Sequence, residues 1–332
     1  MYKLQSILIR INLCRKEFFM SKKIIFMGTP HFAVPILSSL IESTYEVVLV
    51  VTQPDRPKGR RQELTPPPVK EVALKHNIPV FQPENIRNEY EQILETEADL
   101  IVTAAYGQLI PTEILDYPPH GCINVHASIL PELRGGAPIH YALLQGKKET
   151  GITIMFMEET LDTGDIISQQ RISIEEDDHV GTLHDKLAEV GANLLLETLP
   201  QLFSRTFKRA KQDDSKATYA PNITREQEKI DWTKNAEAIY NHIRGLHPWP
   251  VAYTIHEGKR MKVWWAEKND ATYNGKRPGK IVACNDDSFT VVCGNNESIR
   301  ITDIQVAGKK RMKVSEFFRG NKDEIKVGQR LQ

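Results

Sequence analysis

Short apolar runs alternate with stretches of helical spacing through the first half of the chain. The runs are rich in β-branched residues, which favours strands, and the stretches repeat apolar positions every three or four residues, which favours helices. We expect strands at Lys23–Met27, Glu46–Thr52, Ile78–Phe81, Asp99–Ala105 and Cys122–His126, and helices at Phe32–Ser43, Val69–His76, Glu84–Glu97 and Pro111–Leu115. This alternation predicts an α/β domain with a Rossmann-like, doubly wound, mostly parallel sheet.

A hairpin and two further helices are expected next. Ala137–Gln145 and Thr182–Phe203 have helical spacing, whereas Gly151–Met157 and Ile166–Ile174 have strand character and are separated by a turn at Asp162–Asp165. Because so short a connection cannot hold a crossover helix, the two strands should pair antiparallel.

A polar segment then separates two regions of different pattern. Beyond it come one helix, Thr233–Leu246, five short strands and a last helix from Ser315; the strands are expected at Ala252–His256, Met261–Trp265, Lys280–Ala283, Phe289–Val292 and Ile299–Val306. Five short strands favour a small OB-like β-barrel. We therefore expect an extension over residues 1–20, a first domain over 21–205, a linker over 206–224 and a β-barrel domain over 225–332.

Charge is unevenly distributed, although the formal net charge is zero. The residues from Thr206 onward include 24 Lys and Arg but 16 Asp and Glu. Such a basic region favours a polyanionic partner, and chance variation in surface composition is the alternative.

A second basic segment, Gln53–Pro68, combines five prolines with Arg56, Lys58, Arg60 and Arg61. Proline removes backbone donors, so we expect an exposed loop here and no regular element. Its charge suits phosphate groups, and a merely solvated basic loop is the alternative.

Cysteine usage and hydropathy restrict the class of protein further. Cys14, Cys122, Cys284 and Cys293 form no C-x-x-C pair, so neither a zinc site nor a disulfide framework is expected, which fits a cytoplasmic protein. No apolar run approaches the roughly 18 residues of a membrane span. Residues 1–20 lack the features of a signal peptide, and we expect translation to start at Met20 or these residues to be a loose extension.

Candidate chemistry gathers where the strand Cys122–His126 ends. Asn124 and His126 are two residues apart, so in a strand their side chains point to one face. Ligands of doubly wound sheets bind outside the carboxyl ends of the strands, which is where this pair lies. Asp162, in the turn after the next strand, can offer a carboxylate to the same pocket.

These three groups suit direct attack of an amine on an acyl group. Asn124 can donate to a developing oxyanion, His126 can donate or act as an acid or base near neutral pH, and Asp162 can hold an imidazolium. Each pattern alone has a simpler explanation, because Asn-x-His occurs by chance and Asp-Thr-Gly-Asp is a common turn. No metal is predicted.

In combination, Asn-Val-His-x-Ser-x-Leu-Pro, Arg-Gly-x-x-Pro and Leu-Asp-Thr-Gly-Asp resemble the motifs of the 10-formyltetrahydrofolate-dependent formyltransferase family. The resemblance implies that Asn124, His126 and Asp162 are the catalytic trio. It also implies that 10-formyltetrahydrofolate is the formyl donor and that its folate site is lined by Ser128, Ile129, Leu130 and Pro131.

Within that family, the chain is similar to the members that formylate initiator methionyl-tRNA for translation initiation. The similarity extends from Ser21 to the end and includes the Gly-Thr-Pro turn, the Gln-Pro-Asp-Arg-Pro segment and Pro-Trp-Pro. It implies attack by the α-amine through an oxyanion intermediate, and tRNA contacts from Arg56, Lys58, Arg60, Arg61, Lys309 and Lys310. We expect a monomer. The alternatives are a formyltransferase for a small amine, a formyl-tetrahydrofolate hydrolase, or an RNA-binding protein without activity.

Overall fold

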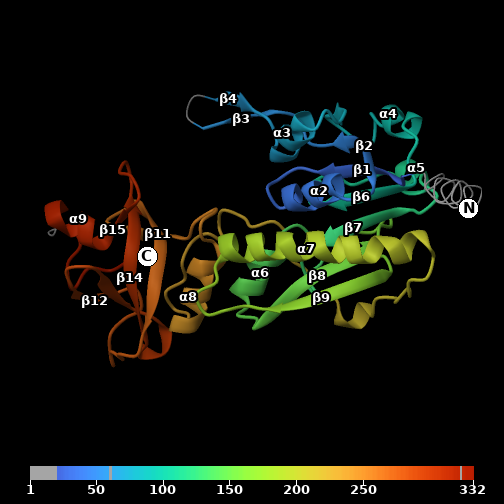
Figure 1. The fold of residues 1–332 in the computed structure, drawn as a ribbon. Helices are drawn as coiled ribbons and strands as arrows, with labels where there is room; N and C mark the ends of the chain where they lie inside the picture. The colour runs from blue at the N-terminus through green and yellow to red at the C-terminus, as the bar shows by residue number, and fades with distance from the viewer. Residues whose placement is uncertain (1–20, 60–61, 322–323) are drawn as a thin grey trace, which may run out of the picture. The chain divides into compact units, whose positions relative to one another are not determined.

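The computed structural model describes residues 21–59, 62–321 and 324–332 (Figure 1). The chain divides into two compact units, one up to Ile123 and one from Asn124 onward. The expected extension over residues 1–20, with the expected start at Met20, lies outside the described residues.

The first unit confirms the expected alternation of strands and helices. Its parallel strands follow the order β5-β2-β1-β6; β6 is fully buried, and β1 is buried except at Lys23. The strands are β1 (Lys23–Gly28), β2 (Glu46–Val51), β5 (Val80–Phe81) and β6 (Leu100–Ala104), and the helices are α2 (Ala33–Glu42), α3 (Pro68–Lys75), α4 (Glu91–Glu95) and α5 (Thr112–Leu115).

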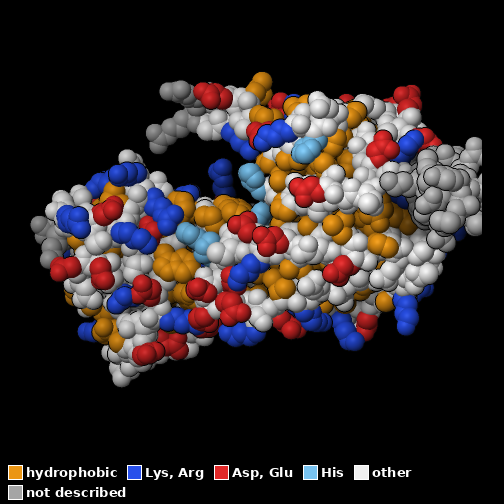
Figure 2. All heavy atoms as spheres, viewed as in Figure 1, with side chains coloured by type: hydrophobic (Ala, Val, Ile, Leu, Met, Phe, Trp, Pro, Cys, Tyr) orange, Lys and Arg blue, Asp and Glu red, His pale blue; other side chains and the backbone are white. Residues whose placement is uncertain are grey.

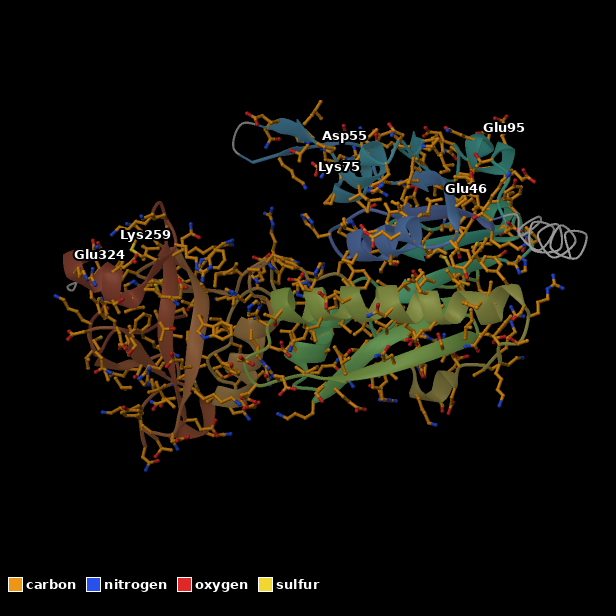
Figure 3. The ribbon with its side chains drawn as sticks, viewed as in Figure 1. Glu46, Asp55, Lys75, Glu95, Lys259 and Glu324 are labelled. Carbon is orange, nitrogen blue, oxygen red and sulfur yellow. The ribbon has the colours of Figure 1, made fainter. Side chains whose placement is uncertain are left out.

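The expectation of an irregular loop over Gln53–Pro68 is wrong. The chain forms a two-stranded antiparallel ribbon there, with β3 (Arg56–Lys58) paired to β4 (Glu63–Thr65). A single proline within β3 is tolerated because a ribbon has edge positions that need no donor. Asp55, labelled at the base of the ribbon in Figure 3, accepts hydrogen bonds from Lys70 and Gln82 at 2.8 Å each, which anchors the ribbon to its unit.

The helix expected over 84–97 is also wrong in extent, because only α4 is helical. Upstream of α4, side chains satisfy the backbone in place of a helix. Asn85 Oδ1 accepts from the backbone N–H of Arg87 at 3.0 Å, and Gln108 Oε1 accepts from that of Ile86 at 2.8 Å. Local bonds of this kind compete with helix formation.

The second unit begins within β7 (Cys122–His126) and confirms the expected hairpin. β8 (Glu149–Phe156) and β9 (Ile166–Ser173) pair antiparallel, which makes the sheet of the N-terminal domain mixed. The 24-residue helix α7 (Val180–Phe203) lies along this pair in Figure 1, and its apolar stripe is buried. The shorter helix α6 (Pro138–Leu144) connects β7 to β8.

The C-terminal strands form one antiparallel sheet that curls into a half-barrel, as the OB-like pattern predicted. Their order is β10-β11-β14-β13-β12, and a sixth strand, β15, pairs with β14. The elements are α8 (Ala236–Gly245), β10 (Tyr253–His256), β11 (Lys259–Asn269), β12 (Ile281–Cys284), β13 (Phe289–Val292), the 3-10 turn η2 (Gly294–Asn296), β14 (Ser298–Val306), β15 (Met312–Lys313) and α9 (Val314–Asn321). The core is apolar and aromatic, with Trp232, Phe289 and Phe317 buried.

A histidine cluster lies where α7 begins against the segment after α8. The rings of His179 and His247 are 4.5 Å apart, and Trp265 lies edge-on to both. His247 Nδ1 is buried and has no hydrogen-bond partner among the described residues. Burial, with the nearby His179 and Arg311, lowers the pKa of His247 from 6.5 to about 4.

This depressed pKa makes the fold acid-sensitive. The unfolded chain binds a proton at His247 below about pH 6.5, whereas the folded chain does so only below about pH 4, so stability falls as the pH is lowered between these values. His247→Asn should reduce that loss by on the order of 1–3 kcal/mol. Urea unfolding at pH 7.5 and 4.5 measures this loss of stability in each variant, with His76→Asn at an exposed position as the control. An unchanged pH dependence of stability in His247→Asn would contradict the prediction.

Candidate active site

The strand β7 carries two polar side chains near its carboxyl end. Asn124 is partly exposed and His126 is buried, with buried Val125 between them. His126 is 6% exposed, so its ring is shielded from bulk water yet lies at the end of the strand.

Both nitrogens of His126 face protein groups. Nε2 lies 3.0 Å from the carbonyl oxygen of Leu133, and a carbonyl can only accept, so Nε2 carries the hydrogen. Nδ1 faces Asp162 Oδ2 at 3.7 Å, beyond hydrogen-bond reach but within ion-pair distance. Nδ1 is therefore the ring nitrogen that faces the carboxylate.

The carboxylate of Asp162 is held from the other side by the backbone. Its Oδ2 accepts from the N–H of Gly135 at 2.8 Å, and the side chain is 8% exposed. Gly135 has a φ of +118°, and a Cβ there would lie 2.8 Å from the carbonyl oxygen of Ala220, so glycine is required at this position. The Arg-Gly motif thus supplies a donor that orients the acid toward His126.

The segment expected to line the folate site is a tight loop held from β8 and β9. The buried Ser128 hydroxyl donates to the carbonyl of Glu132 at 2.6 Å, so it shapes the loop. Thr153 Oγ1 donates to the Ser128 carbonyl and accepts from Leu130 N–H, while Gln169 donates to the Leu130 carbonyl at 2.9 Å. Ile129 and Pro131 remain partly exposed and can contact a ligand.

A cavity of about 180 Å³ lies beside this loop. Ile129 and Leu133 form its apolar wall, and Lys148, Arg171 and Thr150 are among its polar lining. Since ligand pockets typically have volumes of roughly 300–1,000 Å³, this cavity is smaller than a typical ligand pocket.

Two of the expected tRNA contacts, Arg56 and Lys58, belong to β3 of the ribbon. Arg56 forms an exposed ion pair with Glu84 at 2.9 Å, and Lys58 is exposed. Arg60 and Arg61 lie outside the described residues.

In the half-barrel, the two expected tRNA contacts after β14, Lys309 and Lys310, have different surroundings. Lys309 donates to Asn321 and Glu324 at 2.9 Å each, which ties it to the fold, whereas Lys310 is exposed. Lys and Arg side chains gather over the half-barrel in Figure 2. Arg311, which was not among the expected tRNA contacts, lies 4.5 Å from the Trp264 ring centroid and is held there by buried Asp303.

Two negative findings concern the described part of the chain. No group of three or more His, Cys, Asp and Glu residues is placed there to hold a metal ion. Within the same residues, no helix has the length and apolar character needed to cross a membrane.

Comparisons with known proteins extend over both domains. Residues 22–199 match the family model described as formyl transferase, and residues 222–322 match that of the formyl transferase C-terminal domain. A methionyl-tRNA formyltransferase of Geobacillus sp. strain WCH70 is 60% identical over 93% of this chain and 98% of that relative. The enzyme of the same name from Bacillus subtilis strain 168 is 59% identical over 90% and 94%.

Solved structures share the fold at low identity. An N-formyltransferase from Helicobacter canadensis, in complex with folinic acid and dTDP-3-aminofucose, is 18% identical, with a TM-score of 0.66 over 85% of this chain and 99% of that one. HypX from Aquifex aeolicus, in complex with tetrahydrofolic acid, is 16% identical, with a TM-score of 0.62 over 89% and 46%. By the family models and the high identity of its relatives, the chain belongs to the formyl transferase family.

Proposed function

We propose that this protein transfers the formyl group of 10-formyltetrahydrofolate to the α-amine of initiator methionyl-tRNA. The similarity to the Geobacillus enzyme, which extends through both domains, carries the proposal. In this scheme residues 21–205 form the catalytic domain, 206–224 the connection and 225–332 the tRNA-binding domain. The enzyme acts as a monomer in the cytoplasm, where translation begins.

The reaction exchanges one carbon–nitrogen bond for another. The α-amine attacks the formyl carbon, and the carbonyl oxygen becomes an oxyanion. The bond from that carbon to N10 of the folate then breaks, and the proton lost by the amine is transferred to N10. Because no covalent enzyme intermediate is needed, the protein has to orient the two substrates, stabilise the oxyanion and move one proton.

We assign each polar group one of these tasks. Asn124 donates its amide hydrogen to the oxyanion. His126, with Nε2 held by the Leu133 carbonyl, uses Nδ1 either to donate to the oxyanion or to hold the proton. Asp162 stabilises the charged ring at 3.7 Å and helps to accept the proton. The Ser128–Pro131 loop places the donor beside them.

The direct test is formylation of initiator methionyl-tRNA by the purified protein with 10-formyltetrahydrofolate. Formylmethionyl-tRNA as the product supports the proposal. Formate release without an acceptor would indicate a hydrolase, and transfer to an aminosugar nucleotide but not to tRNA would indicate a small-amine formyltransferase. Either result would overturn it.

The exposed basic residues should contribute phosphate contacts. Lys310→Ala should weaken tRNA binding a few-fold at low salt and reduce the slope of log K against log salt by about 0.7–0.9, the value for one phosphate contact. Lys276→Ala, an exposed lysine elsewhere in the half-barrel, is the control. Filter binding across a salt series measures both slopes, and equal slopes for Lys310→Ala and the unmodified protein would remove Lys310 from the interface.

A further inference from the structure

The segment between α7 and the half-barrel is more than a connection. Its residues 210–222, here called the strap, contact the Asp162 turn and Arg134. The strap contains one 3-10 turn, η1 (Asp214–Lys216), and Ala210 exchanges backbone hydrogen bonds with Ile166 at the start of β9. It therefore reaches the strand that leaves the Asp162 turn.

Gln212 of the strap binds that turn directly. Its side-chain Nε2 donates to the carbonyl oxygens of Asp162 and Gly164, at 2.8 Å each. Its Oε1 accepts from Arg134 Nε and Nη2 at 3.1 and 2.8 Å. Carbonyls can only accept and a guanidinium can only donate, so all four bonds define one orientation of the amide.

The turn needs such support because Asp162 has a φ of +55°, which is unfavourable for a residue with a side chain. The direction of its carboxylate depends on this backbone conformation. A change there would move Oδ2 relative to both His126 Nδ1 and the N–H of Gly135.

Arg134, at the other end of this hydrogen-bond network, is also held in place by the strap. Arg134 is 2% exposed, and its guanidinium also pairs with Asp214 of the strap at 2.7 Å. Its backbone N–H donates to the carbonyl of Thr218 at 2.9 Å, and its carbonyl accepts from Ala220 at 2.7 Å. Because Gly135 follows Arg134 directly, the strap holds both the backbone of Asp162 and the donor that orients its carboxylate.

We propose that Gln212 is a positioning residue for the catalytic carboxylate of Asp162. It touches no reacting atom and acts by holding the turn from which the carboxylate projects. This inference rests on the proposed function, in which Asp162 stabilises the protonated His126. The strap then supports the catalytic site as well as connecting the two domains.

The test separates this role from tRNA binding and from folding. Gln212→Ala should lower kcat about ten- to hundredfold, since small displacements of a catalytic group have effects of this size, while KM for both substrates changes less than threefold. Gln201→Ala makes the same chemical change at an exposed site at the end of α7 and should leave kcat unchanged. Thermal unfolding of each variant shows whether the fold is retained.

Two further variants decide the mechanism. Gln212→Glu keeps the acceptor for Arg134 but loses the donor to Asp162 and Gly164, so it should be as slow as Gln212→Ala; normal activity would show that Gln212 only anchors Arg134. When Asp162→Asn is already present, Gln212→Ala should lower kcat by less than a further threefold. A further loss as large as that of Gln212→Ala alone would overturn the inference. Absence of formyl transfer by the unmodified protein would refute the proposed function itself, which is a distinct outcome.

Discussion

Asp162→Asn is expected to lower kcat about 10²- to 10³-fold while tRNA affinity changes less than threefold. Asparagine has the same shape, and its oxygen can still accept from the N–H of Gly135, so the turn should persist. The negative charge is lost, however, and it faces His126 Nδ1 in a site where both side chains are under a tenth exposed. Charge interactions are strong in such shielded surroundings, so the loss falls on the chemical step.

Single-turnover formylation at saturating tRNA measures that step, and filter binding measures tRNA affinity separately. Asp165→Asn is the matched control, because this carboxylate belongs to the same turn but pairs with Arg209, at 3.9 Å. Turnover near that of the unmodified protein in Asp162→Asn would remove the carboxylate from catalysis. A parallel loss in the Asp165→Asn variant would point to damage of the turn as a whole.

The spacing of apolar residues correctly predicted the strands and helices that bury an apolar face. β1, β6 and β7 are fully or mostly buried strands, and α7 has a continuous apolar stripe, so each leaves a regular pattern in the sequence. The spacing gave a wrong helix over 84–97, where side chains hydrogen-bond to the backbone in place of helical bonds. Asn85 and Gln108 satisfy N–H groups upstream of α4, and no count of apolar positions records such bonds.

In the candidate site, too, some residues were predicted from the sequence and others were not. Strand alternation places Asn124 and His126 on one face, and the family motifs add Asp162. Arg134 entered only as part of a family motif, and its partner Gln212 was missed, because Gln212 lies in a polar, irregular segment far from Arg134 in the sequence. Their importance comes from a buried hydrogen-bond network that exists only after folding, and a glutamine in a polar linker has no local signal that distinguishes it from a solvated one.

Arg244→Met is expected to lower the free energy of unfolding by about 1.5–3 kcal/mol, the range for hydrogen bonds made by a charged group. Arg244 is 1% exposed, and its Nη1 donates to the carbonyls of Glu175, Glu176 and Asp178 at 3.0–3.3 Å. Its Nε also donates to Asn241 at 2.9 Å. Methionine fills much of the same space but donates nothing, so the buried Asp178 carbonyl and Asn241 Oδ1 lose this donor and their desolvation is no longer offset. The Glu175 and Glu176 carbonyls keep the Asp178 N–H and the Tyr240 hydroxyl as donors.

Urea denaturation of the unmodified protein and the variant measures the difference, with Arg319→Met, an exposed arginine on α9, as the control expected to change stability by less than about 0.5 kcal/mol. Arg244→Lys should recover only part of the loss, because an ammonium cannot reproduce the planar fork that reaches both Asn241 and the carbonyls before α7. A loss below about 1 kcal/mol in Arg244→Met would show that water replaces the missing donors. The expected larger loss would identify this single side chain as the main polar tie between α8 and the start of α7.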